Sequence, residues 1–329
     1  DACASNPGFH PSVQNPRLHR WIFIRLSALL PGREQVSGLV DRLQCIPHTE
    51  SEAFYLHTLL WQREKPAILT SGTLAAGHNF THIQRRLGLH GGSAVQTVQV
   101  ASPFDYAKNC LLLFPPRPAA HKADKPSRGE TSHERLARQI EQLIHKAHGH
   151  TLVLFTSYDQ MGHVYEQLEG RLPVPLFKAP RGGQWFVEQF KRCDNAVLLA
   201  GGPCWEGVDF PGDIVSLLVI VRLPFPVPDP VREARRQQYP DLHSYIQAEI
   251  VPEMQQKLRQ GFGRAIRTEA DSCAVVILDP RAAPGGRYHQ AVLDALPDGI
   301  PVTTKIEDIE PFLRAHKSPD YFLPNSNHN

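Results

Sequence analysis

Two arginines with a fixed spacing are the most informative chemical feature of the sequence. Arg264 and Arg267 stand in the segment QGFGRAIR, three residues apart and behind Gln260. Because residues three apart lie on one side of a helical turn, the two guanidinium groups are expected to face the same way. Planar, permanently charged donors of this kind suit the oxygens of a polyphosphate. Surface arginines in ordinary salt bridges have the same spacing by chance, so this segment taken alone favours the salt-bridge role.

A glycine-rich segment with two carboxylates is the second feature. The run GGPCWEGVDFPGD begins at Gly201, directly after an apolar stretch. Its Glu206 and Asp209 can accept from a ribose, orient a water molecule or pair with the arginines. Trp205 is either a platform on which a base stacks or a buried anchor. The plainer alternative is a turn whose acidic residues cap helices.

Two segments rich in hydroxyl groups complete the set. Ser71 and Thr73 lie in the run TSGTL, and Thr156, Ser157 and Tyr158 lie in the run FTSYD. Each run follows an expected strand, where hydroxyl and free backbone N–H groups fit a nucleic-acid phosphate. Capping of the next helix is the simpler role, and it is the better one when each run is taken alone.

The elements that must position these segments alternate between strands and helices. Apolar strands are expected at 21–25, 66–70, 94–101, 151–155, 174–177, 196–200, 214–221 and 272–278, and helices at 51–61, 78–89, 131–147, 160–168, 183–191, 229–239, 243–266 and 287–296. The helix over 243–266 is expected to break or kink at Pro252. This alternation predicts an α/β fold with a parallel sheet covered by helices on both faces. Ligands bind such sheets at the carboxyl ends of the strands, where the four segments are expected to gather.

Composition excludes several classes of protein. Hydrophobic residues make up 41% of the chain, which is enough for a core, and the longest apolar run, near 214–221, has the length of a strand. A membrane span is therefore not expected. The 35 basic and 33 acidic residues give a net charge of +2, so a nucleic-acid site must come from local patterning. The six cysteines form no C-x-x-C pair and the histidines no clean metal set, so no metal site is expected. Without a secretion signal, the chain is expected to be cytoplasmic.

In the order in which they occur, these segments resemble the motifs in the second half of superfamily-two helicases of the DinG/XPD branch. SGTL at 71–74 resembles the third motif, usually S-A-T-L, with Gly72 in place of the alanine, and FTSY at 155–158 resembles the fourth. WEGVDFPGD at 205–213 resembles the fifth motif and QGFGRAIR at 260–267 the sixth. The resemblance covers about residues 66–280. It implies a RecA-like P-loop NTPase fold, specifically the second motor domain of a helicase.

The resemblance also implies a role for each group of residues. Arg267 is the first choice for an arginine finger on the γ-phosphate of ATP, with Arg264 beside it and Gln260 positioning both. Coupling of the ATP cleft to the DNA track falls to the acidic and glycine residues of the fifth motif: Glu206, Gly207 and Asp209. Contact with nucleic acid falls to Ser71, Thr73, Thr156, Ser157, Tyr158 and Trp205.

The domain division follows from the same comparison. Residues 1–116 are expected to be the C-terminal remnant of motor domain 1, with the third motif at 70–74, and the proline-rich stretch 117–130 a linker or mobile loop. Residues 131–318 are expected to form motor domain 2, and 319–329 a disordered tail.

The departures from the family pattern concern the groups that bind ATP. The sequence contains neither a G-x-x-x-x-G-K-[ST] phosphate loop nor a D-E-x-H box. ATP and Mg²⁺ are therefore expected to be held mainly by a first motor domain, supplied in cis or in trans, and the chain alone is expected not to hydrolyse ATP. The four cysteines that hold an iron–sulfur cluster in many relatives also have no counterpart, so no cluster is expected. Single-stranded DNA is the expected partner, with RNA as the open alternative.

Three hypotheses follow. The first is the C-terminal part of an ATP-dependent DNA helicase that moves 5′ to 3′, with a helicase of a mobile-element or CRISPR-associated system as a sub-case. The second is a non-enzymatic, helicase-derived module that binds nucleic acid or a protein partner. The third, a minor one, is an unrelated α/β protein that binds another nucleotide.

Overall fold

The computed structural model describes residues 53, 56–61, 67–89, 95–116, 131–181, 183–210 and 212–323. The chain divides into two compact units. The first unit comprises 1–75, 79–98 and 227–248, and the second comprises 76–78, 99–226 and 249–329. The strand expected at 21–25 and the linker expected at 117–130 lie outside the described residues. None of the helices in the described ranges is long and apolar enough to cross a membrane.

The described part of the first unit is helical. It contains η2 (His57–Trp61), α4 (Thr81–Arg86), α9 (Pro230–Arg236) and α10 (Leu242–Tyr245). Segments distant in sequence meet here, since Arg85 donates to the hydroxyl of Tyr239 at 3.3 Å. The strand expected at 66–70 was wrong for 67–70, which form no strand.

The strand expected at 94–101 was also wrong. Residues 95–101 form no strand, and Val98 and Val100 are 77% and 85% exposed. Alternating apolar residues favour a strand only where one face can be buried against a core. Here the apolar side chains have nothing to bury them.

The second unit is built on a seven-stranded sheet with the order β3-β4-β2-β5-β6-β1-β7. The strands are β1 (Cys110–Leu113), β2 (Thr151–Phe155), β3 (Leu176–Lys178), β4 (Val197–Gly201), β5 (Leu217–Ile220), β6 (Cys273–Ile277) and β7 (Val302–Thr303). Every pairing in it is parallel. The α/β class with a parallel sheet was therefore predicted correctly.

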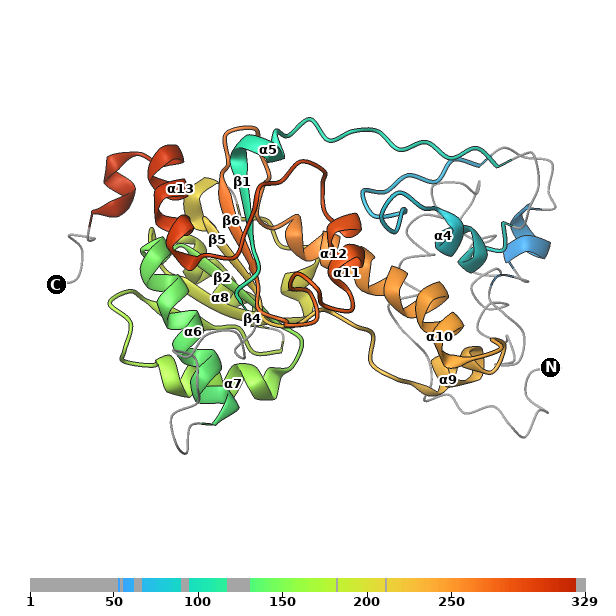
Figure 1. The fold of residues 1–329 in the computed structure, drawn as a ribbon, viewed down its shortest axis with the longest axis horizontal. Helices are drawn as coiled ribbons and strands as arrows, with labels where there is room; N and C mark the ends of the chain where they lie inside the picture. The colour runs from blue at the N-terminus through green and yellow to red at the C-terminus, as the bar shows by residue number, and fades with distance from the viewer. Residues whose placement is uncertain are drawn as a thin grey trace. The chain divides into compact units, whose positions relative to one another are not determined.

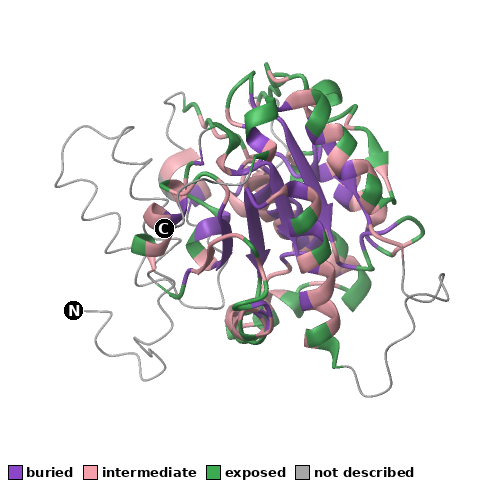
Figure 2. Ribbon diagram, turned by 90° about the vertical axis from the view of Figure 1, so that its left-hand side faces the viewer, coloured by how far each residue is buried: buried purple, intermediate pink, exposed green. Residues whose placement is uncertain are grey.

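Helices cover both faces of this sheet (Figure 1). On one face α6 (Ser132–Ala147), α7 (Tyr158–Leu168) and α13 (Ile309–His316) bury their apolar sides against alternate strand residues such as Val153 and Val219. The other face is covered by α8 (Gln184–Lys191), α11 (Val251–Phe262) and α12 (His289–Ala295). Burial on both sides explains why the five inner strands read as continuous apolar runs, and Figure 2 shows the sheet buried at its centre.

Two expected boundaries differ from the structure. Strand β1 pairs with β6 in register from Cys110 to Leu113, so it belongs to the main sheet and not to a preceding domain. The described residues on both sides of 117–130 belong to the second unit, so the expected domain boundary at this stretch was wrong. The pairing joins residues about 160 positions apart, which local sequence patterns do not report. In addition, the helix expected over 243–266 divides into α10, the π-helical turn η6 (Ile246–Ile250) and α11, with the irregular turn just ahead of Pro252.

The tail expected to be disordered from residue 319 is ordered as far as it is described. Residues Pro319–Phe322 form a 3-10 turn, and the buried Tyr321 donates its hydroxyl to the carbonyl oxygen of Ala147 at 2.7 Å. Its ring stacks on His150, with the ring centroids 4.1 Å apart. The C-terminal segment is thus fastened to the amino end of β2.

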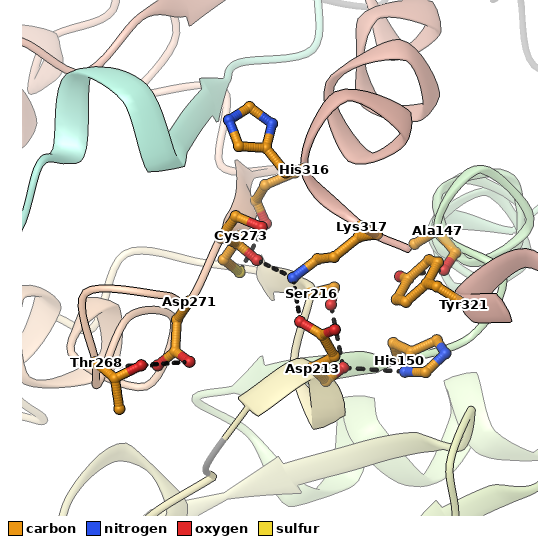
Figure 3. A network of polar contacts seen from close by, with 12 residues as sticks. Ala147, His150, Asp213, Ser216, Thr268, Asp271, Cys273, His316, Lys317 and Tyr321 are labelled. Carbon is orange, nitrogen blue, oxygen red and sulfur yellow. Dashed lines mark hydrogen bonds and ion pairs between the residues drawn. The ribbon is translucent and has the colours of Figure 1, made fainter. Parts of the chain in front are cut away.

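A polar network surrounds this contact at the amino ends of β2, β5 and β6 (Figure 3). Lys317, whose side chain is 2% exposed, lies 2.5 Å from the carboxylate of Asp213 and donates to the carbonyl of Ser272 at 2.8 Å. His150 contacts the Asp213 carbonyl oxygen through Nδ1 at 3.0 Å. Burial lowers the pKa of His150 to about 4, so its imidazole is neutral at pH 7.

Candidate functional site

The arginine pair follows helix α11, which ends at Phe262 with Gly263 as its C-cap. Arg264 and Arg267 therefore lie in the turn beyond the helix and not on it, contrary to the expectation from spacing alone. A buried carboxylate shapes this turn: Asp271 accepts from the backbone N–H groups of Arg267 and Thr268, both at 2.8 Å. The turn still brings both guanidinium groups to one place.

That place is the loop of the fifth motif. Arg264 and Arg267 both donate to the carbonyl oxygen of Val208, Arg267 at 3.2 Å. The Nε of Arg267 also forms an ion pair with the carboxylate of Asp209 at 3.0 Å. Of the three roles open to Asp209, the structure therefore shows pairing with an arginine. Glu206, in the same loop, is exposed.

The two arginines differ in how freely they can change partners. Arg264 is 9% exposed, and its Nε donates to the backbone carbonyl of Gln260 at 3.3 Å. Burial, followed by repulsion from Arg267, lowers the pKa of Arg264 to about 10, so it stays charged at pH 7. The ion pair of Arg267 lies at the surface, with its side chains 31% and 69% exposed, and such pairs contribute roughly 0–1 kcal/mol. Arg267 can thus leave Asp209 at little cost, whereas Arg264 is fixed.

Trp205 is a buried anchor and not a base platform, so its expected contact with nucleic acid was wrong. It is 1% exposed, and its indole N–H donates to the carbonyl of Phe155 at 2.9 Å. A Cβ added at Gly261 would lie 2.6 Å from the indole ring, so α11 approaches the ring as closely as only glycine allows. Trp205 thereby joins the end of β2 to the helix that precedes the arginines.

The hydroxyl-bearing residues of the fourth motif lie at the same edge, because they follow β2. Thr156 and Ser157 are exposed, and the Ser157 side chain caps α7 by accepting from Gln160 at 3.2 Å. Capping, the simpler role considered for this run, is therefore present. The half-buried ring of Tyr158 lies against the end of β4, where a Cβ on Gly202 would come within 2.4 Å of its hydroxyl.

The third motif belongs to the first unit and is described by itself. Its residues lie in a turn, in which the Ser71 hydroxyl accepts from the backbone N–H of Thr73 at 3.4 Å. Because no strand is found at 67–70, the expected position at a strand end was wrong. The structure brings together three of the four motifs.

Sequence reasoning missed two contributors to the site. The carbonyl of Val208 carries no sequence signal, because any residue supplies one. Asp271 has a weak signal, namely an acidic residue three positions after a threonine that opens a turn.

Comparison with known proteins agrees with this geometry. Residues 140–299 match a family model described as a helicase C-terminal domain. The chain is 34% identical over 254 residues to the ATP-dependent DNA helicase DinG of Photobacterium profundum, covering 74% of this chain and 36% of that protein. It is 32% identical over 243 residues to the 3′-5′ exonuclease DinG of Bacillus subtilis (71% and 26%) and 31% identical over 230 residues to the ATP-dependent DNA helicase YoaA of Escherichia coli (68% and 34%). The chain spans between about a quarter and just over a third of the length of these relatives.

Among solved structures, an XPD structure without ligand aligns with a TM-score of 0.42 and 20% identity over 60% of this chain and 39% of that one. Dbp5 of S. cerevisiae bound to RNA and ADP BeF3 aligns with a TM-score of 0.41 and 14% identity over 65% of this chain and 46% of that one. The family model and the DinG and YoaA relatives identify the chain as a helicase C-terminal portion of the DinG type, and its fold is a parallel α/β sheet.

Proposed function

We propose that this chain is the second motor part of an ATP-dependent DNA helicase that moves 5′ to 3′ on a single strand. The observation that carries the proposal is the convergence of Arg264 and Arg267 on the loop of the fifth motif, where Arg267 donates to the Val208 carbonyl and pairs with the exposed carboxylate of Asp209. An arginine finger must be charged, close to the cleft and able to exchange a carboxylate for a phosphate. The permanent charge of Arg267 and the exposure of its partner Asp209 support the assignment.

The remaining residues are assigned by their contacts. Arg264 and Gln260 position the loop and the turn, because the guanidinium of Arg264 bridges the carbonyl oxygens of Val208 and Gln260. Glu206, Gly207 and Asp209 are assigned to coupling between the ATP cleft and the bound single-stranded DNA. Gly207 has a φ of +79°, a conformation that glycine adopts freely, so it can serve as the bend of the loop.

ATP and Mg²⁺ are assigned to a first motor domain joined in cis or in trans. In this chain Asp209 is paired with Arg267, so we do not assign Mg²⁺ to it or to the exposed Glu206. What this chain supplies is positive charge at the far side of the cleft. Such an arginine is worth about 10³–10⁵ in the rate of phosphoryl transfer. We assign the strand contacts to Thr156, Ser157 and Tyr158 at the carboxyl edge and to Ser71 and Thr73 in the other unit, with single-stranded DNA as the partner.

The test is Arg267→Ala in the complete two-lobe motor. DNA-stimulated ATP hydrolysis should fall by about 10³-fold or more, while binding of an oligothymidylate should change less than about twofold. Arg171→Ala is the matched control, because Arg171 forms an exposed ion pair with Glu141 at 2.6 Å in the same unit. The control should keep both activities.

The same experiment separates the proposal from a non-enzymatic module. If hydrolysis by the complete protein were unaffected by Arg267→Ala, the finger assignment would be wrong. If the complete protein bound single-stranded DNA but hydrolysed no ATP, the chain would be a helicase-derived binding module. An oligouridylate measured beside the oligothymidylate tests the RNA alternative.

A further inference from the structure

An exposed tryptophan and an arginine lie at the carboxyl edge of the sheet without a role in the motifs described above. Trp185 is 63% exposed, and its one described ring contact is edge-on to Phe186, with the centroids 4.9 Å apart. A single exposed aromatic side chain is ordinary on a protein surface, so the groups around Trp185 decide whether it belongs to a binding surface. Trp185 stands in the first turn of α8, directly beyond β3.

Arg181 lies in the tight turn between β3 and α8. The turn is closed by a hydrogen bond from the N–H of Gly183 to the carbonyl of Pro180 at 2.9 Å. Arg181 is exposed, and its guanidinium carbon lies 5.2 Å from the centre of the Tyr158 ring. This cation–π contact holds the arginine over the fourth motif while its N–H groups stay available to solvent.

The neighbouring groups extend this surface. Strands β3, β4 and β2 are adjacent and parallel, so the turn after β3 and the fourth motif after β2 lie at one edge. The ammonium of Lys178, at the end of β3, lies 4.3 Å from the centre of the Tyr165 ring. Two cations held over aromatic rings, an exposed tryptophan and the hydroxyls of Thr156 and Ser157 therefore share this edge. The acidic groups among the described residues nearby include the exposed Asp159, Glu169, which accepts from Tyr165, and Glu188, which pairs with Lys191.

We infer that Arg181 and Trp185 form a further contact for the single strand, in which a base stacks on Trp185 and Arg181 binds a backbone phosphate. The inference rests on the proposed function and names a part of its strand track. Sequence-tolerant strand binding combines these two elements, cationic groups for the backbone and aromatic rings for the bases. Because Arg181 lies over the ring of Tyr158, its phosphate contact and the contacts assigned to the fourth motif would lie along the same DNA strand.

The test is binding of a fluorescein-labelled 20-nucleotide oligothymidylate to the whole chain, measured by anisotropy at several salt concentrations. Trp185→Ala should weaken binding about tenfold, the range found for a base stacked on an aromatic ring, and Trp185→Phe should lose less. Arg181→Ala should weaken binding and reduce the slope of log K against log salt by about 1, as expected for one lost phosphate contact. In a fluorescence titration, the quenching caused by the oligonucleotide should be lost largely in Trp185→Phe.

Matched controls exist at the opposite edge of the sheet. Arg314 is also an arginine over an aromatic ring, with its guanidinium carbon 4.5 Å from the centre of Phe322, and Leu323 is 61% exposed. Both belong to the C-terminal segment fastened at the amino end of β2. Arg314→Ala and Leu323→Ala should leave binding within about twofold of the parent chain.

The outcomes separate this inference from the proposed function. If the chain binds the oligonucleotide and both Trp185→Ala and Arg181→Ala bind as well as the parent, the inference is wrong and the proposed strand role stands. If Trp185→Ala changes self-association but not strand binding, the surface is a protein interface and the inference is again wrong. If the parent chain does not bind the oligonucleotide at all, the strand role fails and this inference fails with it.

Discussion

The two edges of the sheet use charged groups in opposite ways. At the carboxyl edge, Arg267 pairs with Asp209 at the surface, where both side chains are accessible to water. At the amino edge, Lys317 is almost fully buried and is held by Asp213 and by the carbonyl of Ser272 (Figure 3). An exposed pair can change partners at little cost, whereas a buried charge is costly to separate from the groups that hold it.

The loop of the fifth motif connects these two environments. It leaves β4 beside the arginines and reaches Asp213, which lies at the amino edge ahead of β5. Its end is therefore fixed by Lys317, while Val208 and Asp209 near its start stand at the candidate cleft. The end of this loop is thus held by a buried lysine, whereas its start carries an exposed ion pair that can change partners.

The largest expected effect on stability concerns Trp205, which is buried at the carboxyl ends of the strands. Trp205→Ala should lower the free energy of unfolding by about 3–5 kcal/mol, because it removes a fully buried indole that packs on α11. Denaturant unfolding measures this change. Removal of an exposed tryptophan on which a base stacks would destabilise the fold far less. A change in the free energy of unfolding under about 1 kcal/mol would therefore contradict the role of Trp205 as a buried anchor.

Breaking the amino-edge pair comes next. Lys317→Met keeps most of the apolar stem but leaves the carbonyl of Ser272 without its donor, so unfolding should become easier by about 2 kcal/mol. Asp213→Asn should cost less, because the Asp213 side chain is half-exposed and an amide still accepts a hydrogen bond. Urea unfolding of both variants tests this order; equal stability of Lys317→Met and the parent would contradict an anchoring role.

The amino edge should also be sensitive to acid. The pKa of His150 is lowered from 6.5 to about 4 in the folded chain, so the unfolded chain binds the extra proton between these values. The stability that comes from the neutral imidazole is complete above pH 6.5 and is lost as the pH falls toward 4. Between pH 7.5 and pH 5 this contribution should fall by roughly 2 kcal/mol. His150→Gln should show a smaller decrease in urea unfolding over the same interval, and an identical decrease would contradict the assignment.

The smallest effect is expected at the surface pair of the carboxyl edge. Asp209→Asn removes the charge that holds Arg267 but should change the free energy of unfolding by less than about 0.5 kcal/mol. Thermal or urea unfolding checks this value. A loss near that of Lys317→Met would mean that the two edges do not differ as described.

The sequence predicted the central part of the fold well because its signals are local. The strand expected at 151–155 is β2 to the residue, and the helix expected at 131–147 begins one residue later because Thr131 is its N-cap. Apolar runs and capping residues act within a few positions, so they can be read without knowing the fold. The order of the motifs likewise indicated the carboxyl edge as the candidate site.

The errors have a common physical origin in contacts that are distant in sequence. The four-residue strand β1 is stabilised by β6 and β7, from residues more than 160 positions away. The C-terminal turn is ordered because Tyr321 is buried against His150 and Ala147, which no local pattern reports. At the site, the common target of the two arginines is a backbone carbonyl, so their convergence could be seen only in three dimensions.

The most direct test of the central claim is steady-state ATP hydrolysis by this chain alone, with and without a 20-nucleotide oligothymidylate, beside anisotropy binding of the same oligonucleotide. The account predicts salt-sensitive strand binding with no hydrolysis above background, as expected of a motor half that supplies the arginine but not the phosphate loop. Hydrolysis stimulated by the oligonucleotide and abolished by Arg267→Ala would contradict it, because the chain would then contain a complete nucleotide site of its own.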